Sequence, residues 1–431
     1  MLDYRFIVDN LEAVKKNIAD RFMKADADAA ARLFARRTAL ATELQNLQRE
    51  RNANAQGMKG KLGEEERKAL IEEGKKLKDG IAAAGEELAR IEKDLDAEVR
   101  RIPNMAHPDA PVGKEDKDNL EVKRVGSPTV FDFTPKDHVE LGQDLDIIDF
   151  DAGTRVSGTK FYYLKNQGVL LELGLVRYAL DILQNRGFTP FITPDVAKEE
   201  ILEGIGFNPR GEESNVYTLE GEDSCLVGTA EITLGGYYAG TILPGGKLPL
   251  RMAGLSHCFR RDAGAAGQFS KGLYRVHQFT KLEMFVYCLP EESGKFHEEL
   301  RSIEEEIFSG LEIPFRVVDT CTGDLGAPAY RKWDLEAWMP GRADRPGGGG
   351  SWGEVTSTSN CTDYQARRLN IKYKDDEGKN KFVHMLNGTA IAVSRGIIAI
   401  LENFQQADGS VKLPAALVPY CGFDRIEKKA R

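Results

Sequence analysis

The chain has 431 residues, of which 41% are hydrophobic and 29% are charged, and its formal net charge is −9. This composition fits a globular protein of two or three domains and excludes nucleic-acid binding through an overall positive charge. No apolar run reaches the roughly 18 residues of a membrane helix, and charges interrupt the N-terminal stretch, so neither a membrane span nor a signal peptide is expected. The six cysteines form no CxxC pair, which disfavours structural zinc and fits reduced thiols in the cytoplasm.

The first hundred or so residues have the patterns of helices. Residues 1–25 predict one short amphipathic helix, with Asp9 as its N-cap. Residues 27–102 then carry a narrow apolar seam in two runs, Leu33, Leu40, Leu44 and Leu47, then Leu77, Ile81, Ala84, Leu88, Ile91 and Leu95. Between the runs lies NANAQGMKGKLGEEE, a predicted break with three glycines and an acidic start to the next helix. The pattern predicts two long helices folded into an antiparallel coiled-coil hairpin, the second of about 35–38 residues.

Charge is nearly balanced in this hairpin, with 16 basic and 15 acidic residues, whereas the remainder of the chain is acidic. Basic residues cluster on the first helix and near the tip: Arg32, Arg36, Arg37, Arg49, Arg51, Lys59 and Lys61. The residues alone leave two interpretations open, a coiled coil that dimerises and an arm that reaches RNA. Pro103, Pro108 and Pro111 end the second helix and indicate a domain boundary near residue 105.

Helix and strand patterns mix from about residue 120 onward. A long apolar helix is followed by the sequence RGFTPFITP, which predicts a helix–strand unit ending at Pro194. Further on, Thr229, Ala230 and Glu231 stand at a strand–helix junction. Glu231 either binds a ligand or is an acidic residue in the first turn, where the helix dipole favours it.

The stretch from His257 to Cys288 predicts a hairpin of two long strands around a loop with three glycines. One face of these strands is expected to present a charged set: Arg260, Asp262, Arg275, His277 and Glu283. Such a cluster indicates a site for a charged ligand. The alternative is a solvated outer face with cross-strand ion pairs.

Three further patterns follow the hairpin. By strand alternation we expect one face to carry four polar residues, Glu354, Thr356, Thr358 and Asn360. The Gly-rich tract before them, residues 341–353, lacks the GxxxxGK[ST] pattern of a phosphate loop, so we expect a surface insertion. The last pattern is a strand, a turn and an apolar helix with Arg395, whose long side chain can extend from a buried helix to solvent.

The hairpin consists of Phe-Arg-x-acid, a loop and then RVHQFTKLE. This pattern resembles motif 2 of the class II aminoacyl-tRNA synthetases, and its particular residues resemble those of the bacterial seryl-tRNA synthetases. The chain resembles the three class II motifs in the order in which the family has them: motif 1 over about 176–194, motif 2 over about 256–288 and motif 3 over about 383–404. The resemblance implies an α+β fold. Residues 1–105 would form a domain with the antiparallel coiled-coil arm, and residues 106–431 a class II catalytic domain on an antiparallel sheet with flanking helices.

The resemblance also implies the function. The enzyme would be a serine–tRNA ligase that activates L-serine with ATP and Mg²⁺ and transfers the seryl group from seryl-adenylate to tRNA(Ser). Whether tRNA(Sec) is also charged stays open. A cytoplasmic homodimer formed through motif 1 is expected, with no zinc and no membrane attachment. The arm would bind the tRNA through Arg32, Arg36, Arg37, Arg49 and Arg51.

Residue roles follow from the same motifs. The resemblance assigns serine binding to Thr229, Ala230, Glu231, Glu283 and Thr389. It assigns ATP binding to Arg260, Arg261, Asp262, Val276, Glu354, Val355, Thr356, Ser357 and Arg395. Within that set, Arg260 and Arg395 would be catalytic through their phosphate contacts, and Glu354, with Glu336 as a second candidate, would hold Mg²⁺ through ATP. The chain has Asp262 where the family has Glu, and Ser394 where glycine is usual.

Two alternatives remain, one a different enzyme and the other a protein of a different functional class. A ligase that loads an amino acid onto a carrier protein would resemble the catalytic half but lack the arm, so residues 27–102 argue against it. A non-catalytic paralogue that binds RNA would have no reason to keep four charged site residues together, namely Arg260, Glu283, Glu354 and Arg395.

Overall fold

The fold is taken from a computed structural model, which describes the chain except for residues 61–62, 209–213, 262–269, 343–348 and 429–431. Lys61 and Asp262, both singled out from the sequence, lie outside the described residues. The chain divides into two compact units, Met1–Met105 and Ala106–Arg431. No helix in the described part of the chain is long and apolar enough to cross a membrane.

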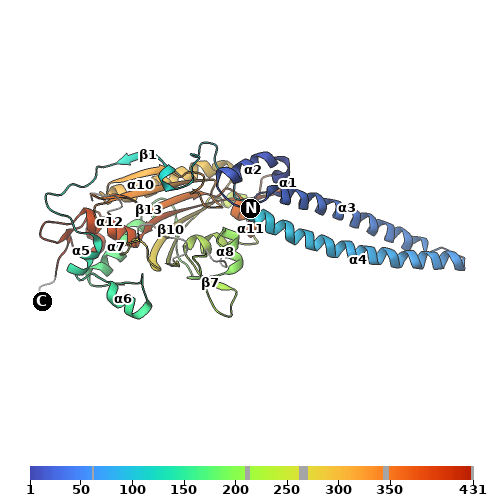
Figure 1. The fold of residues 1–431 in the computed structure, drawn as a ribbon, viewed down its shortest axis with the longest axis horizontal. Coiled ribbons are helices and arrows are strands. Elements are labelled where there is room, and N and C mark those ends of the chain that lie inside the picture. The colour runs from blue at the N-terminus through green and yellow to red at the C-terminus, as the bar shows by residue number, and fades with distance from the viewer. Residues whose placement is uncertain (61–62, 209–213, 262–269, 343–348, 429–431) are drawn as a thin grey trace. The chain divides into compact units, whose positions relative to one another are not determined.

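The N-terminal unit is a long helical hairpin preceded by two short helices, α1 (Tyr4–Asp9) and α2 (Leu11–Asp20) (Figure 1). The expectation of one helix capped by Asp9 is wrong, because Asp9 is the last residue of α1. The N-cap of α1 is Asp3, whose carboxylate accepts hydrogen bonds from the backbone N of Arg5 and Phe6. Asn10 separates the two short helices.

The hairpin itself confirms the predicted coiled-coil arm. Helix α3 (Ala27–Gly57) and helix α4 (Glu64–Arg101) lie side by side along their length (Figure 1). Helix α4 has 38 residues. The buried residues of the two helices come from the predicted seam or lie beside it, and include Leu40, Leu77, Ala84, Ile91 and Leu95. The expected break between the helices is shorter than predicted, since α3 continues to Gly57.

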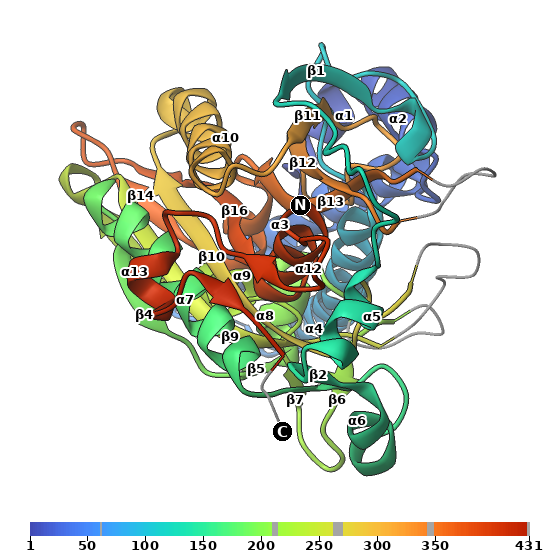
Figure 2. The same ribbon diagram turned by 90° about the vertical axis from the view of Figure 1, so that its left-hand side faces the viewer.

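The C-terminal unit is built on an eight-stranded sheet in the order β1 (Leu120–Val125), β11 (Phe315–Asp319), β12 (Arg331–Met339), β13 (Ser351–Asn360), β16 (His384–Ala392), β10 (Gln278–Cys288), β9 (Leu250–Phe259) and β4 (Thr189–Ile192). Figure 2 follows this order from β1 at the top to β4 at the lower left. Every neighbouring pair is antiparallel except β4 with β9. The predicted antiparallel sheet with flanking helices is confirmed.

Short elements complete this unit. The helices are α5 (His138–Asp144), α6 (Phe150–Ser157), α7 (Gln167–Asn185), α8 (Glu199–Ile205), α9 (Ala230–Gly236), α10 (Ser293–Gly310), α11 (Tyr364–Leu369), α12 (Val393–Asn403) and α13 (Val418–Cys421). The 3₁₀ turns are Asp116–Asp118, Gly245–Lys247 and Pro290–Glu292. Two small sheets have two strands each, β2 (Ile148–Asp149) with β3 (Tyr163–Leu164) and β17 (Val411–Lys412) with β18 (Arg425–Ile426). Two others have three strands. In one, β7 (Ser224–Leu226) lies between β5 (Val196–Lys198) and β6 (Tyr217–Thr218), and in the other β14 (Lys372–Lys374) lies between β8 (Ile242–Pro244) and β15 (Asn380–Phe382).

The large sheet is covered differently on its two faces. Leu282, Met284 and Val286 of β10 enter a large core with residues of α7, α10 and α12. Phe285 and Tyr287 of the same strand point to the opposite face and join a smaller core with α8, α9 and α11. Because successive side chains of a strand alternate, the residues that precede Phe285 on that second face begin the candidate site.

Two local expectations in this unit are wrong. Both hairpin strands stop farther from the loop than predicted, since β9 ends at Phe259 and β10 begins at Gln278. The last backbone hydrogen bond between the two strand ends runs from Arg260 N to His277 O. The next residue, Arg261, donates its backbone N–H to Asn215 O in another segment. In motif 3 there is no turn, because β16 runs directly into α12.

Candidate active site

A β-bulge in β13 decides which of its side chains face the site. Strands β12 and β13 pair Leu335 with Thr356 and Glu336 with Glu354, so Val355 is an extra residue between them. Directly opposed residues share a face of a sheet. Glu354 therefore lies on the face of Glu336, and Thr356 lies on the opposite face with Leu335. The expectation that Glu354 shares a face with Thr356, Thr358 and Asn360 is wrong for this reason.

The bulge turns Thr356 away from the face of Glu354 and Glu336, called the ligand face below, and the side chain of Val355 also lies off this face. Val355 is 1% exposed and Thr356 is 2% exposed, and Val355 belongs to the large core under the sheet. Ser357 is opposed to Asp334, which alternates with Leu335 and so shares the face of Glu336. On the ligand face, therefore, β13 presents Glu354 and Ser357.

A buried ion pair lies on the same face in β10. Lys281 Nζ is 2.7 Å from Glu283 Oε2, and both side chains are buried. Thr389 Oγ1 donates to the same oxygen over 3.1 Å. A second bulge assists this contact, because Glu283 pairs with Thr389 and Leu282 with Ile391, which leaves Ala390 unopposed. The outcome is a carboxylate whose Oε2 carries both contacts.

A second carboxylate stands at the start of α9. Glu231 Oε1 accepts hydrogen bonds from Gln365 Nε2 at 2.8 Å and Asn387 Nδ2 at 3.0 Å. Burial, and then the charge of Glu283, raises the pKa of Glu231 to about 7. Thr229 and Ala230 are buried beneath it, and Thr229 Oγ1 accepts from Glu231 N as the helix N-cap. Their side chains thus hold the junction, and the Glu231 carboxylate is the group that interacts with the charges of Glu283 and Arg260.

Arg260 follows β9 and is partly buried. Its Nε donates to Gly228 O over 3.1 Å, and its guanidinium lies 5.4 Å from the centroid of the Phe279 ring. Its positive charge acts to lower the pKa of both Glu231 and Glu354. Arg260 is therefore electrostatically linked to both carboxylates of the face.

Arg395 stands in the first turn of α12 and contacts Glu354 directly. Its Nη1 donates to Glu354 O over 2.9 Å and lies 3.3 Å from Glu354 Oε2. Burial acts to raise the pKa of Glu354, but the charges of Arg395, Lys332 and Arg260 outweigh it, and the net direction is downward. Glu354 is therefore ionised at neutral pH.

An aromatic ring supports Arg395. The guanidinium carbon is 4.7 Å from the centroid of the Tyr274 ring, and that of Arg342 is 4.8 Å from the same centroid. Arg342 Nη1 also donates to Tyr274 OH over 2.9 Å and to Trp352 O over 3.0 Å. Two guanidinium groups thus gather at this end of the face.

Other predicted residues have different surroundings. Val276 is buried and Arg261 is exposed. Glu336 is bonded to Arg316, with Nε to Oε2 at 2.6 Å. In the described part of the chain, no group of three or more His, Cys, Asp or Glu could hold a metal ion alone. Glu354 and Glu336, opposed across two strands, are the pair that suits a hard cation with phosphate ligands.

Several residues that contact the predicted ones carried no assigned role in the sequence analysis: Lys281, Tyr274, Arg342, Gln365 and Asn387. Asn387 stands two residues before Thr389, so strand alternation places both on one face and could have indicated it. Gln365 lies on α11, where nothing in the local pattern points to Glu231.

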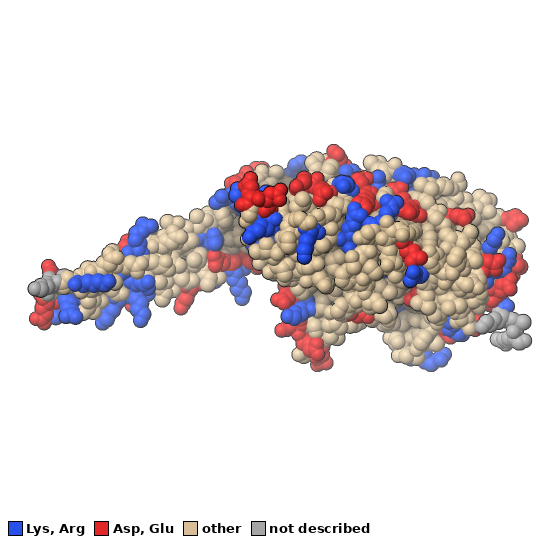
Figure 3. Space-filling view, turned by 180° about the vertical axis from the view of Figure 1, so that it is seen from behind, with Lys and Arg blue, Asp and Glu red and all other residues tan. Residues whose placement is uncertain are grey.

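The arm carries the remaining candidates. Arg36 Nη2 lies 2.6 Å from Glu87 Oε1, and Arg37 Nε lies 3.0 Å from Glu92 Oε1. Arg49 and Arg51 are exposed closer to the tip. Figure 3 shows Lys and Arg side chains along the arm with Asp and Glu between them. Basic groups are therefore available along the hairpin in spite of its balanced charge.

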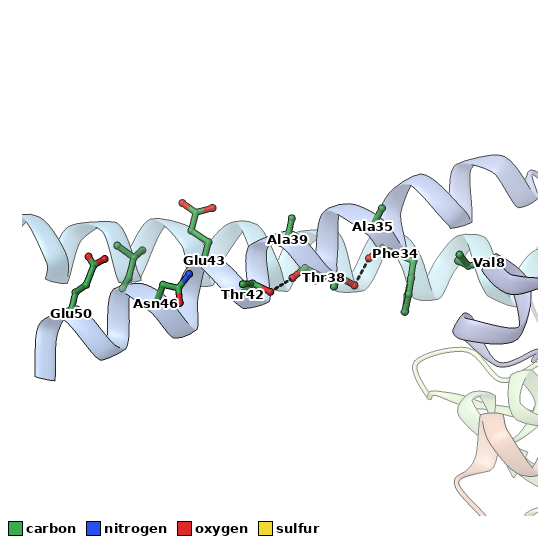
Figure 4. Close-up of a pocket in the computed structure, with 10 residues that line it drawn as sticks. Val8, Phe34, Ala35, Thr38, Ala39, Thr42, Glu43, Asn46 and Glu50 are labelled. Atoms are coloured by element: carbon green, nitrogen blue, oxygen red, sulfur yellow. Dashed lines mark hydrogen bonds between the residues drawn. The ribbon is translucent and has the colours of Figure 1, made fainter. Parts of the chain in front are cut away.

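The arm also has an open, largely apolar groove of ≈ 910 Å³ along α3 (Figure 4). Val8 and Phe34 line one end and Glu50 the other. The hydroxyls of Thr38 and Thr42 donate to the backbone O of Phe34 and Thr38, at 2.9 and 3.0 Å. The groove holds none of the predicted site residues, and its hydroxyls are used within the helix.

Comparison with known proteins matches both units. A family model described as the seryl-tRNA synthetase N-terminal domain matches residues 1–106. A model described as the tRNA synthetase class II core domain (G, H, P, S and T) matches residues 217–404.

Individual relatives match over the whole length. A serine–tRNA ligase of Treponema denticola is 72% identical over 426 residues, which cover 99% of this chain and 100% of the relative. A serine–tRNA ligase of Borreliella burgdorferi is 56% identical over 429 residues and 100% of both chains. The crystal structure of a seryl-tRNA synthetase from Pyrococcus horikoshii complexed with ATP has a TM-score of 0.92 at 40% identity, with 100% of both chains covered.

Proposed function

The chain belongs to the seryl-tRNA synthetases, which are class II serine–tRNA ligases, and from this premise we propose which of its residues perform each part of the reaction. The family, the fold class and the ligase activity predicted from the sequence are thereby confirmed. The residue assignment rests on one observation: the carboxylates of Glu231 and Glu283 lie near the guanidinium groups of Arg260 and Arg395. The charges suit a zwitterionic amino acid beside a polyphosphate.

Serine binding is proposed for the two carboxylates. Lys281 and Thr389 both contact Oε2 of Glu283, and Oε1 would accept the hydroxyl hydrogen of serine. In the same way Gln365 and Asn387 contact Oε1 of Glu231, and Oε2 would bind the ammonium group by a charge-assisted bond. Alanine would leave the Glu283 oxygen unpaired, which discriminates far more strongly than a missing methylene. The buried side chains of Thr229 and Ala230 would support Glu231 from below.

ATP binding is proposed for the arginine end of the face. The P. horikoshii relative was crystallised with ATP, and this chain matches it over its full length. Arg260 would hold the α-phosphate, where negative charge develops, and Arg395 the departing pyrophosphate. Ser357 lies on the ligand face, whereas Val355 and Thr356 could reach ATP through their backbone. Arg261 and Val276 remain candidates, and Asp262 lies outside the described residues.

Magnesium fits the same end of the face. Glu354 is ionised because Arg395, Lys332 and Arg260 lower its pKa, and Glu336 stands directly opposite it. These two carboxylates would hold a Mg²⁺ ion that ATP brings, and the ion would neutralise phosphate charge. The residues of the chain then have to position the reactants and to balance the charge that Mg²⁺ leaves.

The chemistry needs no covalent enzyme intermediate. The serine carboxylate attacks the α-phosphorus as the bond to pyrophosphate breaks, which yields seryl-adenylate. The proposed roles of Arg260 and Arg395 are to align the attacking oxygen of the serine carboxylate with the leaving oxygen of pyrophosphate, and to stabilise the negative charge that moves from one to the other. In the second step the terminal hydroxyl of the tRNA attacks the seryl carbonyl, and AMP leaves.

The arm would bind tRNA(Ser), and tRNA(Sec) where a cell has it, through phosphate contacts of its basic residues. Arg32, Arg36, Arg37, Arg49 and Arg51 are the proposed contacts. The place of action would be the cytoplasm, where tRNA is charged for translation. Deleting residues 27–102 is expected to spare adenylate formation and to abolish tRNA charging. Equal loss of both activities would make the arm a structural element.

A homodimer is proposed from exposed apolar side chains on the helix that leads into motif 1 and on the strand of that motif. On α7, Val169, Leu170 and Leu173 are 41–59% exposed, and Ile192 of β4 is 88% exposed. Apolar side chains gathered on one helix–strand unit are typical of a protein interface. Sedimentation at micromolar concentration should give twice the chain mass. A monomer would contradict the assignment of motif 1.

The experiment that tests the proposed function is ATP–pyrophosphate exchange with serine, threonine, alanine, glycine or no amino acid. Exchange with serine alone would support both the adenylate chemistry and the reading of the hydroxyl by Glu283. Exchange with glycine or alanine would contradict the Glu283 role and favour a carrier-protein ligase. Absence of exchange from folded protein would favour the non-catalytic RNA-binding paralogue.

A further inference from the structure

His138 and Glu402 form a buried hydrogen-bond junction that no step of the proposed reaction uses. His138 is the first residue of α5 and Glu402 lies in the last turn of α12, and each side chain is 2% exposed. Glu402 Oε1 accepts from His138 Nδ1 at 2.7 Å and from His138 N at 3.0 Å, and Oε2 accepts from Gly341 N at 2.8 Å. A carboxylate at a helix C-terminus is disfavoured by the helix dipole, so these three donors offset that cost.

The second ring nitrogen of His138 reaches another segment. Leu273 N donates to His138 Nε2 over 3.1 Å. Because Nε2 accepts, the proton of the neutral ring belongs on Nδ1, where it is donated to Glu402. The imidazole therefore connects the carboxylate of Glu402 to the backbone of Leu273.

The backbone packs tightly around this junction. Gly272 has φ +56°, and a Cβ added to it would lie 2.2 Å from His138 Nε2. A Cβ on Gly341 would lie 2.6 Å from Cβ of Asp137. Lys271 forms an ion pair with Asp137, the N-cap of α5. The backbone at 271–273 and at 341 is thus held against α5 and the end of α12, with little room to shift.

The residues that follow these two anchor points contact Arg395 or its support. Tyr274 follows Leu273, its ring lies under the Arg395 guanidinium, and its backbone O lies 3.5 Å from Arg395 Nε. Arg342 follows Gly341 and bonds the hydroxyl of Tyr274. Arg395 itself lies in the first turn of α12, the helix whose last turn holds Glu402. One buried pair therefore connects three segments that surround one guanidinium.

We infer that His138 and Glu402 are positioning residues for ATP: by fixing the backbone of Leu273 and Gly341 they hold Tyr274 and Arg342, and these hold Arg395 in place for the phosphates. The inference rests on the proposed role of Arg395. Neither His138 nor Glu402 contacts substrate in this assignment. Their loss should act on ATP and leave serine binding nearly unchanged, because the contacts of Glu231 and Glu283 do not include them.

Two substitutions of His138 separate its two bonds. The amide nitrogen of H138N can stand near the Nδ1 position and donate to Glu402, but nothing then accepts from Leu273 N. The longer side chain of H138Q can place its oxygen near the Nε2 position and accept that bond. E402Q cannot accept from both His138 and Gly341, because its amide nitrogen replaces one of the two acceptors.

The matched control is T129V. Thr129 Oγ1 donates to Asn403 Oδ1 over 2.6 Å, at the residue next to Glu402 and at the same end of α12. T129V thus removes a hydrogen bond from this helix end without touching Leu273 or Gly341. It should lower Tm without changing the KM for ATP.

The measurement is ATP–pyrophosphate exchange with serine, with KM for ATP, KM for serine, kcat and Tm determined for each variant. H138N and E402Q are expected to raise the KM for ATP about tenfold, the effect of removing one buried hydrogen bond. The KM for serine should stay within about twofold, and H138Q should restore most of the ATP affinity that H138N loses.

A KM for ATP within twofold of wild type in E402Q and in whichever His138 variants fold would overturn the inference, whatever their Tm. An equal rise in the KM for ATP in T129V would also overturn it, since general loosening of α12 would then explain the effect. R395A distinguishes the proposed role of Arg395 from the inferred role of His138 and Glu402. An unchanged KM for ATP in R395A overturns the proposed role of Arg395 and the inference together, whereas a raised KM for ATP in R395A with a normal one in H138N and E402Q overturns the inference alone.

Discussion

The arm and the catalytic face of this chain carry charge in opposite ways. Arg36 and Glu87 of the arm form an ion pair with side chains 51% and 36% exposed. Lys281 and Glu283 of the sheet form a pair with side chains 7% and 2% exposed. Exposed pairs contribute little to stability and exchange readily for other partners, whereas a buried pair is costly to break because the remaining charge stays desolvated. The arm can thus offer its cations to a phosphate backbone, while the sheet holds its carboxylates in fixed places.

The strongest way to break this comparison is to remove one charge from the buried pair. K281M leaves Glu283 buried with Thr389 as its remaining contact, and the free energy of unfolding is expected to fall by about 3–5 kcal/mol. Urea unfolding followed by tryptophan fluorescence measures this directly, since Trp333, Trp338 and Trp352 all belong to the C-terminal unit.

The control for this prediction is K379M, which removes an exposed lysine that pairs with Glu377 in the same unit. Its unfolding midpoint should equal that of the wild type. A K281M protein as stable as K379M would show that the pair on the sheet is solvated like an exposed ion pair.

The next largest effect is expected on catalysis. R260A should reduce adenylate formation by about a hundredfold or more, because the variant lacks a preorganised cation next to developing charge. Its stability should change less than that of K281M, since Arg260 is only partly buried. Exchange kinetics near wild type would remove Arg260 from the site. R36A on the arm is the matched control, and its exchange rate should not change.

The same two regions differ in how far the sequence predicts them. The arm follows from local periodicity, since the seam residues Leu77, Ala84 and Ile91 recur at heptad steps and are buried in the hairpin. The end of its first helix is less predictable than the seam, because the residues before Gly57 are compatible with both helix and loop. Helix length and pairing are properties of neighbouring residues, which a pattern can report.

The catalytic face depends on contacts between distant strands, and there the patterns fail locally. Motif order predicted the sheet and brought Glu283 and Thr389 together. One extra residue, Val355, reversed the alternation of β13 and sent Thr356 to the core. A bulge is set by the pairing of two strands, so β13 read alone cannot reveal it. The contact of Gln365 with Glu231 spans 134 positions and has no local signature at all.

The raised pKa of Glu231 gives a smaller and pH-dependent effect. Its pKa is about 7 because burial and Glu283 favour the neutral form. The ammonium group of serine requires the carboxylate, so kcat/KM for serine should rise up to tenfold per pH unit as pH increases toward 7 and then level off. The stability contribution has the opposite sign, since a raised carboxyl pKa stabilises the fold below the ordinary value of 4.5, and this is lost as pH rises to about 7.

E231Q separates this titration from others in the enzyme. The variant keeps a group of similar size at the start of α9 but cannot ionise, so its lower kcat/KM should lack the rise toward pH 7. A variant with the same pH profile as the wild type would assign the titration to another group. No arm residue should shift this profile, which is a further contrast between the two units.

The smallest expected effect concerns the arm cations themselves. Arg36 is already paired with Glu87, while Arg49 and Arg51 are exposed closer to the tip. If phosphates are bound by the exposed arginines, the double variant R49A/R51A should weaken tRNA binding several-fold. It should also lower the slope of log K against log salt by about one for each phosphate that the variant no longer binds. R36A should change this slope less, because its charge is already balanced before the tRNA arrives. Filter binding at several salt concentrations measures both, with serine-dependent exchange as the control that the catalytic unit is intact. Equal slopes for R36A and R49A/R51A would mean that the Arg36–Glu87 pair opens on binding, and that exposed ion pairs of the arm serve as a reserve of cations.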